Sequence, residues 1–424
     1  MKAFGILIFA TLLNGQTELP KDVLQLSQIR REIGKSLDTL DNYTCVETIN
    51  REERKNERQR FQHVDTVNVE VAVVNDHELY SWPGAHEFDD RDVGELVGGG
   101  LISTGGFRSA LNNVFISNGS TIRWHGNEEV RGRRAIRWDY TIPYNLSRWH
   151  VQIEGRGGRV SETGSFWVDA ETLEVLRLET AAQDIPPDLR VKSIRETLDY
   201  ARMRVRGREL LLPQSVETSV TNQNGVESRN RIEFSHCREF GSAAELTFKE
   251  PKAVGQTVLP VTELQLPAGV EVSIQTAQRI DSRTATVGDR ITAIVYSPVH
   301  YHRAVLIPKG AQFEGRIRRV ERQLSPRPYY LVGLEFTDIE FQGHHARFFG
   351  EMLGIHPVPG LTLGISTFNG YKNSAGVAGT EIRSRTETEI TFKVPGVSTF
   401  FMEGRDFRIP EGMQMTWVTT KLGK

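Results

Sequence analysis

The apolar residues of this chain recur with two spacings, which predict one helix and many strands. Between Asp22 and Leu40 they stand three and four positions apart, which is typical of an amphipathic helix. From Tyr43 onward apolar and polar residues alternate, most clearly over Val67–Val73, and a period of two predicts half-buried strands. Turn residues such as Asn224-Gly225 separate the strands and predict hairpins. The pattern therefore indicates a mainly β protein in which an antiparallel meander packs on one helix.

Two segments interrupt the strand pattern. Residues 89–115 carry two glycine-rich runs between short helical patterns, which predicts a helical flap across the sheet. Residues 250–263 contain Pro251, Gly255 and Pro260 with little periodicity, as linkers do. We therefore expect a first domain over residues 16–248, a linker over 249–263 and a second β-barrel or sandwich domain over 264–424. The two domains are expected to fold independently.

The first residues predict export from the cytoplasm. Lys2 precedes an apolar run from Ala3 to Leu13, and Gly15 is small, so residues 1–15 are interpreted as a cleaved signal peptide. The run is too short to span a bilayer, and no later apolar stretch reaches ~20 residues. A periplasmic or secreted protein with no integral membrane span is expected. The alternative is a buried N-terminal strand or helix.

Two cysteines, Cys45 and Cys237, lie near the start and the end of the first domain. In an oxidising compartment such a pair predicts a disulfide that ties the first and last strands together. The alternative is two unrelated buried thiols.

The N-terminal half resembles the LolA/LolB lipoprotein-carrier superfamily. One helix followed by a long meander is shared with it, as are Phe166-Trp167-Val168-Asp169 with the following Thr172, Arg177 and Glu179, and Leu212-Pro213 before the last hairpin. The resemblance implies a curved antiparallel half-barrel and a lipid or lipoprotein as ligand.

The C-terminal half resembles the β-barrel domain of the VirB10/TrbI type. The shared turns are Leu266-Pro267-Ala268-Gly269, Asp281-Ser282, Gly288-Asp289 and Ile307-Pro308-Lys309-Gly310, with Gly315 five residues further on. These are turn motifs, so the resemblance implies a fold rather than an activity. The chain lacks the inner-membrane helix and proline-rich spacer of the secretion-system proteins, which argues against a channel.

Charge and motifs exclude several classes of function. The formal net charge is −2, which does not favour nucleic acid as a partner. The charged segment Arg51–Arg60 interleaves both signs and predicts a solvated surface. We find no Gly-x-Ser-x-Gly, no His-Glu-x-x-His and no phosphate-binding glycine loop. No catalytic, cofactor or metal site is therefore predicted.

Two groups of residues remain as candidates for binding. The imidazoles of His300, His302, His344, His345 and His356 could form a metal set, although exposed loop histidines are the alternative. Tryptophans concentrate in the first domain, and Trp82, Trp124 and Trp138 are candidates for contact with an apolar ligand under the flap. The alternative is that they form core beneath the helix.

These observations predict a non-catalytic, exported cell-envelope protein that binds an apolar ligand, either a lipid or a lipoprotein, or an envelope protein partner. Two alternatives stay open: an envelope hydrolase whose active site is not recognised, and a purely structural component of an assembly.

Overall fold

The computed structural model describes residues 19–421, apart from 39–42, 75–76, 86–87, 89–92, 99–100, 103–107, 154–155, 206, 240–261, 265, 325–326, 368–369 and 373–393. The predicted signal peptide and most of the predicted linker lie outside the described residues. Within them, no helix is both long and apolar enough to cross a bilayer.

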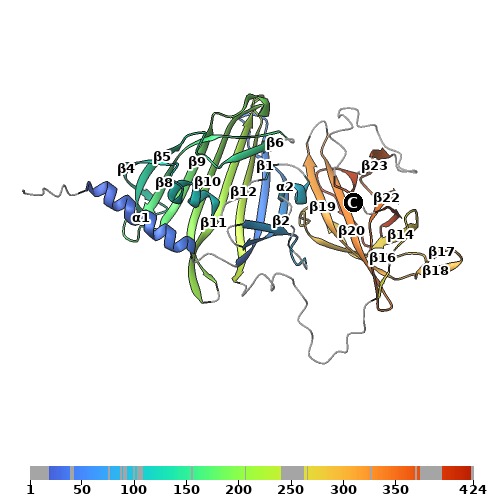
Figure 1. Ribbon diagram of the computed structural model, residues 1–424. Helices are drawn as coiled ribbons and strands as arrows, with labels where there is room; N and C mark the ends of the chain where they lie inside the picture. The colour runs from blue at the N-terminus through green and yellow to red at the C-terminus, as the bar shows by residue number, and fades with distance from the viewer. Residues whose placement is uncertain are drawn as a thin grey trace, which may run out of the picture.

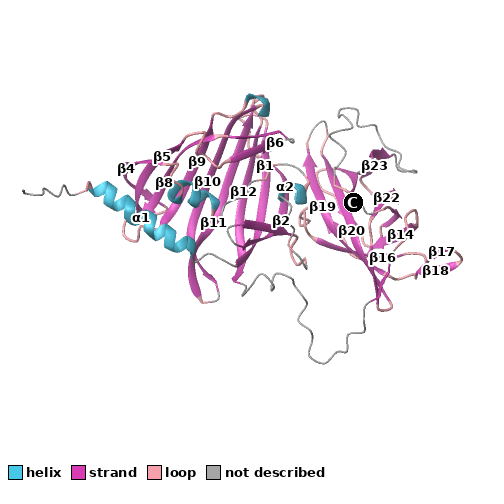
Figure 2. Ribbon diagram, in the orientation of Figure 1, coloured by secondary structure: helices cyan, strands magenta, loops and turns pink. Residues whose placement is uncertain are grey.

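The N-terminal half forms a curled antiparallel sheet of ten strands, a half-barrel (Figures 1 and 2). Its spatial order is β3-β2-β1-β12-β11-β10-β9-β8-β5-β4, so the first and last strands of the meander are neighbours. The strands are β1 Tyr43–Arg54, β2 Gln62–Val74, β3 His77–Ser81, β4 Thr121–Val130, β5 Arg133–Ile142, β8 Ser161–Asp169, β9 Val175–Gln183, β10 Val191–Val205, β11 Arg208–Asn222 and β12 Glu227–Glu239. A separate hairpin joins β6 His150–Ile153 to β7 Arg156–Arg159.

β-Bulges, and a glycine against which the ring of Tyr140 packs closely, give this sheet its curvature. Register shifts occur in β1, β5–β4, β8–β9 and β10–β11, and such bulges bend a strand and increase its twist. Gly164 on β8 lies under the ring of Tyr140, and a Cβ there would come within 2.7 Å of that ring. The absence of a side chain at Gly164 therefore lets Tyr140 fold across the inside of the curve.

Short helices cover the inner face of the half-barrel. They are α1 Lys21–Asp38, α2 Val93–Val97, α3 Ser109–Leu111, the π-helix η1 Asn112–Ile116 and, outside the cover, the 3-10 helix η2 Pro187–Leu189. α1 lies across the strands from the β4 side toward β11 (Figure 1). Its Ile29, Ile33 and Leu37 are buried at helical spacing, which confirms the predicted amphipathic helix. The flap predicted from the glycine runs does contain two helical pieces, α2 and α3–η1.

The charged segment Arg51–Arg60 is exposed over residues 55–60, as predicted, and differs from its prediction only at its start. Arg51 to Arg54 continue β1 instead of standing in solvent, because oppositely charged residues lie opposite them. Arg54 pairs with Glu227, and Glu52 accepts hydrogen bonds from Arg229 at 2.6 and 2.9 Å. Cross-strand charge pairs of this kind stabilise a sheet surface.

The predicted disulfide is present. Cys45 on β1 and Cys237 on β12 are bonded, with their Cα atoms 4.1 Å apart, and the bond joins strands 192 positions apart in the sequence. Cys45 is buried in the core of the half-barrel.

The C-terminal half forms a second sheet of eleven strands. Its main path is β22-β27-β14-β16-β19-β20-β25-β23-β24, and β13 pairs with β21, which pairs with β20. The strands are β13 Thr262–Leu264, β14 Glu271–Thr276, β16 Arg290–Val295, β19 Gln312–Gln323, β20 Tyr329–Phe341, β21 His344–Arg347, β22 Gly350–Ile355, β23 Leu361–Thr367, β24 Gly370–Lys372, β25 Ser398–Glu403 and β27 Gln414–Thr419. Two small pairs stand apart: β15 Ile280–Asp281 with β26 Arg408–Ile409, and β17 Val299–Tyr301 with β18 Ala304–Ile307.

The two halves are in contact, which the expectation of independent domains did not include. The backbone of Val287 forms a parallel bridge to β2, donating to the Thr66 carbonyl and accepting from the Asn68 amide at 2.9 Å each. Its side chain is fully buried within the N-terminal core. Gly288 is required next to it, because a Cβ at this residue would lie 2.5 Å from the Asn68 carbonyl oxygen. One turn of the C-terminal half thus extends the N-terminal sheet.

Candidate functional site: the concave face of the half-barrel

A continuous apolar row crosses the inner face of the half-barrel. Register pairs each member with the next across eight neighbouring strands, and all are buried. We call this set the apolar row; it comprises Trp138, Phe166, Leu178, Leu198, Val216, Ile232, Ile49 and Val67. Such a surface is large enough to run along an extended hydrocarbon chain, since eight strands at about 4.8 Å spacing span roughly 35 Å.

A second row, two residues further along every strand, is polar. We call it the polar row; it comprises Tyr140, Gly164, Thr180, Glu196, Thr218, Asn230, Arg51 and Asp65. Its hydrogen bonds run along it: the hydroxyls of Tyr140 and Thr180 are 2.6 Å apart, and Thr218 donates to Glu196 at 3.1 Å. Arg51 closes the row with a two-pronged bond to Asp65 at 2.5 and 2.6 Å.

Two buried carboxyl groups on this face have raised pKa values, which favour their protonated form. Burial raises the pKa of Glu196 to about 7, with the charges of Glu78 and Glu162 adding to the effect and the Thr218 hydroxyl opposing it. Burial also raises the pKa of Glu47 to about 8, again with Glu78 contributing. Glu47 stands on β1 two residues from Ile49, on the side of the apolar row away from the polar row.

Two polar atoms beside these carboxyls are buried without a hydrogen-bond partner among the described residues. They are the Tyr200 hydroxyl and the Asn230 Oδ1. Burial, followed by the charge of Glu196, raises the pKa of Tyr200, so the phenol stays protonated. An unsatisfied buried polar atom costs about 1–3 kcal/mol. These buried polar groups of the inner face therefore lower the free energy of unfolding, and the packing around them does not offset the loss.

A few polar contacts hold the helical cover on this face. Arg108, at the start of α3, donates to the Leu37 carbonyl at 2.7 Å and so joins the flap to the end of α1. Asn230 of the polar row donates to the Leu101 carbonyl at 2.7 Å, and Asn113 of η1 donates to Glu162 at 2.6 Å. Phe115 meets Phe166 of the apolar row edge-to-face at 4.6 Å.

The C-terminal half reaches the same cover through arginines. Arg318 is buried, lies 4.8 Å over the Trp82 ring, pairs with Glu335 and donates to the Leu96 carbonyl of α2 at 2.7 Å. Arg316 donates to the Pro83 carbonyl at 3.2 Å, and Arg290 to that of Gly84. Burial and the neighbouring Arg290 and Arg318 lower the pKa of Arg316 to about 10. We call Arg290, Arg316 and Arg318 the arginine clamp.

The three tryptophans singled out in the sequence occupy different environments. Trp138 is part of the buried apolar row, as the core interpretation expects. Trp124 pairs with Trp138 but stands on the edge strand β4, where 52% of it is exposed, so it extends the row to the sheet edge. Trp82 lies under the arginine clamp, away from solvent. Their role in ligand binding stays a prediction.

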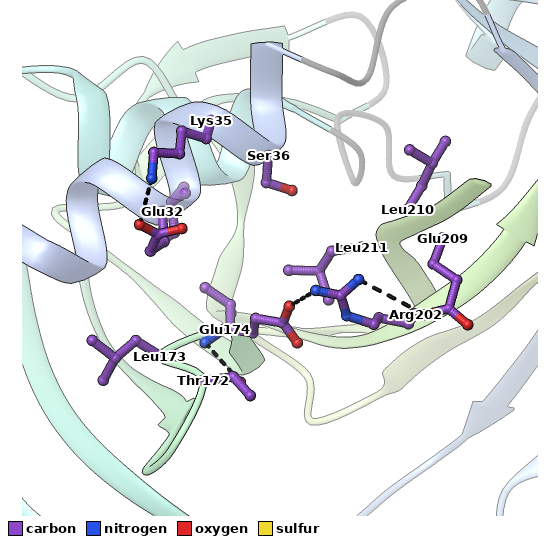
Figure 3. A pocket seen from close by; sticks show the side chains of 12 residues that line it. Glu32, Lys35, Ser36, Thr172, Leu173, Glu174, Arg202, Glu209, Leu210 and Leu211 are labelled. Atoms are coloured by element: carbon purple, nitrogen blue, oxygen red, sulfur yellow. Dashed lines mark hydrogen bonds and ion pairs between the residues drawn. The ribbon is translucent and has the colours of Figure 1, made fainter.

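A cavity of about 210 Å³ opens between α1 and the ends of β9 to β11 (Figure 3). Charged pairs line it, namely Lys35 with Glu32 and Arg202 with Glu174. Its walls also include Ile33, Leu210 and Leu211. At this size, below the usual range of about 300–1,000 Å³, it suits water or ions rather than an acyl chain.

The histidines named as a candidate metal set do not come together among the described residues. His300 and His302 lie on the β17–β18 hairpin, whereas His345 on β21 is bound to Asp338 at 2.9 Å. Among the described residues, no three His, Cys, Asp or Glu side chains are arranged to hold a metal ion.

A serine, an aspartate and a histidine meet on the outer face, but not as a catalytic triad. Ser165 donates to Asp139 at 2.7 Å, and His125 contacts the other oxygen of Asp139 at 2.8 Å. Serine and histidine therefore share the carboxylate, with no serine–histidine bond through which a proton would move.

Comparison with known proteins gives only weak likenesses. No family model and no curated protein matches the sequence. Similar solved structures include an outer membrane lipoprotein-sorting protein domain from Vibrio parahaemolyticus (11% identity, TM-score 0.28), covering 52% of this chain and 95% of that one. A LolA superfamily protein from Nitrosomonas europaea (9%, 0.27) covers 52% and 97%, and a Mycobacterium tuberculosis lipoprotein (10%, 0.20) covers 52% and 98%.

LolA-superfamily and lipoprotein-sorting structures are thus among those similar to about half of the chain. At these identities and TM-scores the likenesses do not assign the chain to a family. The VirB10/TrbI-type resemblance expected for the C-terminal half receives no support.

Proposed function

We propose that the protein is a non-catalytic binding protein whose half-barrel takes up an apolar ligand, a lipid or the lipid part of a lipoprotein, along the apolar row. The observation that carries this proposal is how that row is covered. Eight strands present a continuous apolar surface, and the cover is a set of short helical segments instead of a second sheet. A ligand would enter by displacing α1 or the flap, exchanging one apolar contact for another at small net cost.

We further propose that the protein works in the cell envelope after export. Two features support this location: the apolar N-terminal run of the sequence, and the Cys45–Cys237 disulfide, since such bonds persist in oxidising compartments. The two sheets are proposed to be two domains with the boundaries given above, joined through the arginine clamp.

Uptake of a dansyl-labelled fatty acid by the purified mature chain tests the proposal. Arg108→Ala removes the bond that joins the flap to α1 and should speed uptake severalfold, because the cover opens more often. Arg134→Ala is the matched control, since Arg134 is 81% exposed and pairs with Glu171 on the surface. Native mass spectrometry of protein isolated from envelopes should show added mass in the range of a lipid.

The alternatives give different results in the same experiments. Failure of wild type and Arg108→Ala alike to bind the probe, with stable oligomers and no copurified lipid, would favour a structural component. Turnover of a fatty-acid ester that one polar substitution abolishes, with folding intact, would favour a hydrolase.

A further inference from the structure

The β17–β18 hairpin projects from the C-terminal half, beyond β14 and β16 (Figure 1). It forms a two-stranded sheet of its own, with Tyr301 directly opposite Ala304. Only Val299 and Ile307, at its base, are buried, while all six residues from His300 to Val305 are exposed. A hairpin of this kind contributes little to the core of the molecule, so its tip requires another explanation.

Apolar and aromatic side chains gather at this tip. Val305 is 55% exposed, Tyr301 40%, and Tyr296, just before the hairpin, 45%. In the register of the hairpin Val305 is opposite His300 and Tyr301 is opposite Ala304, so Tyr301 and Val305 stand on opposite faces and each face of the tip exposes one of them. Tyrosine has an apolar ring with a polar end, which suits the boundary between water and an apolar phase.

The turn is formed by residues that its backbone disfavours. With Tyr301 opposite Ala304, the two central residues are His302 (φ 48°) and Arg303 (φ 68°), both left-handed. This turn geometry favours Asn-Gly, and a bulkier residue there is strained by on the order of 1 kcal/mol. The identity of these residues is thus better explained by their side chains than by turn formation.

The segment is positively charged. From Tyr296 to Gly310 the sequence contains Arg303, Lys309, His300 and His302 and no aspartate or glutamate, in a chain of net charge −2. The Lys309 ammonium lies 5.8 Å from the centre of the Tyr296 ring, so a cation and an aromatic ring act together at the base of the hairpin.

We propose that the β17–β18 hairpin tip docks on a lipid bilayer that contains anionic lipids, with Tyr301 and Val305 at head-group level and Arg303 against the lipid phosphates. Interfacial aromatic rings and neighbouring cations are the features that hold proteins at such surfaces. A tip of six exposed residues is far smaller than the area of about 1,000 Å² that a stable protein interface needs, which favours a bilayer over a protein partner. The proposal does not depend on ligand uptake by the half-barrel.

Vesicle cosedimentation of the full chain tests the docking. Binding should be stronger to vesicles of phosphatidylcholine with phosphatidylglycerol than to phosphatidylcholine alone, and should weaken with salt. Each cation near the surface contributes about fivefold in affinity, so Arg303→Gln should weaken binding by that factor. Tyr301→Ser with Val305→Ser should weaken binding to both kinds of vesicle.

Matched controls exist on the N-terminal half. Tyr144 is 51% exposed and Arg134 81% exposed, so Tyr144→Ser and Arg134→Gln alter the same chemistry elsewhere and should leave binding unchanged. The double variant His302→Asn, Arg303→Gly separates folding from docking. It suits the turn, so it should raise thermal stability while weakening vesicle binding.

Three outcomes would overturn the proposal: no preference of the wild type for anionic vesicles, equal binding by the hairpin variants, or an altered oligomeric state of these variants in the absence of lipid. The last would identify the tip as a contact between copies of the chain.

Discussion

The interiors of the two sheets differ in the side chains they bury and in the elements that close them. In the C-terminal half, Phe336 and Phe348 each contact Trp417 and Phe313 edge-to-face, with ring centres 4.9 to 6.2 Å apart. All four are buried, and the strands themselves close the core. This is dense aromatic packing, in which the Trp417 indole nitrogen is nevertheless buried with no hydrogen-bond partner among the described residues. In the N-terminal half, buried carboxyls stand beside the apolar row, and helices rather than strands close the interior.

The difference supports the proposal that the N-terminal half is the one that binds a ligand. Glu47, Glu196 and the Tyr200 hydroxyl lower the stability of the fold, and no contact in the packing compensates for this. Places where a protein departs from the rules of packing are where function is expected. The C-terminal core, by contrast, provides a rigid body from which the arginine clamp and the β17–β18 hairpin project.

The largest expected effect comes from one truncation made in both interiors. Phe313→Ala should lower the free energy of unfolding by about 3–5 kcal/mol, because the surrounding rings cannot close the cavity. Phe166→Ala should cost less, about 2–3 kcal/mol, since η1 with Phe115 can settle toward the sheet. Denaturant unfolding measures both. Equal losses would remove the distinction between the two interiors.

The disulfide should stabilise one half only. Replacing Cys45 and Cys237 by serine should cost about 2–4 kcal/mol, because the unfolded chain regains a loop of 192 positions. Hydrogen exchange followed by mass spectrometry should show faster exchange in β1 and β12 with β20 and β27 unchanged. Acceleration in the C-terminal strands as well would mean that the clamp makes both halves unfold together.

Arg318→Ala tests that coupling. The substitution leaves Glu335 without its partner and Leu96 without a donor, which should cost about 2–3 kcal/mol. It should also speed fatty-acid uptake, because α2 loses its link to the C-terminal half. Arg327→Ala is the control, since Arg327 is 78% exposed and its distance of 3.9 Å from Glu403 makes a weak surface ion pair. Uptake at the wild-type rate would show that the clamp does not hold the cover.

The sequence predicts the helices and strands of this fold better than the contacts between elements that are far apart in the chain. The spacing of Ile29, Ile33 and Leu37 defines α1, and the glycine runs mark the flap, because both are local signals. The cysteine pair was identified from its position and the expected compartment. The bridge at Val287 was not predicted, since a single residue that adds to a distant strand leaves no periodic trace.

The polar row shows why the site escaped sequence reasoning. Glu196, Thr218 and Asn230 each stand two residues from a buried apolar residue of the same strand, so they interrupt the inward apolar positions and leave no clear apolar run to read as a site. Only the register between strands shows that they lie side by side. Trp82 was singled out as an aromatic residue for a ligand, but its partner Arg318 is more than 200 positions away in the sequence.

The smallest expected effect is a pH dependence that belongs to the half-barrel. Glu47 and Glu196 have folded-state pKa values of about 8 and about 7, against an ordinary value of 4.5. Between pH 4.5 and 8 the folded protein holds protons that the unfolded chain has released, so its free energy of unfolding falls as the pH rises. Glu196→Gln and Glu47→Gln should therefore each raise stability by about 1–2 kcal/mol at pH 8 and change little at pH 4. Glu171→Gln, at a surface carboxyl 74% exposed, should behave as wild type throughout. If the glutamine variants keep the wild-type slope, these carboxyls are not the strained groups of the concave face, and the two interiors differ less than their composition suggests.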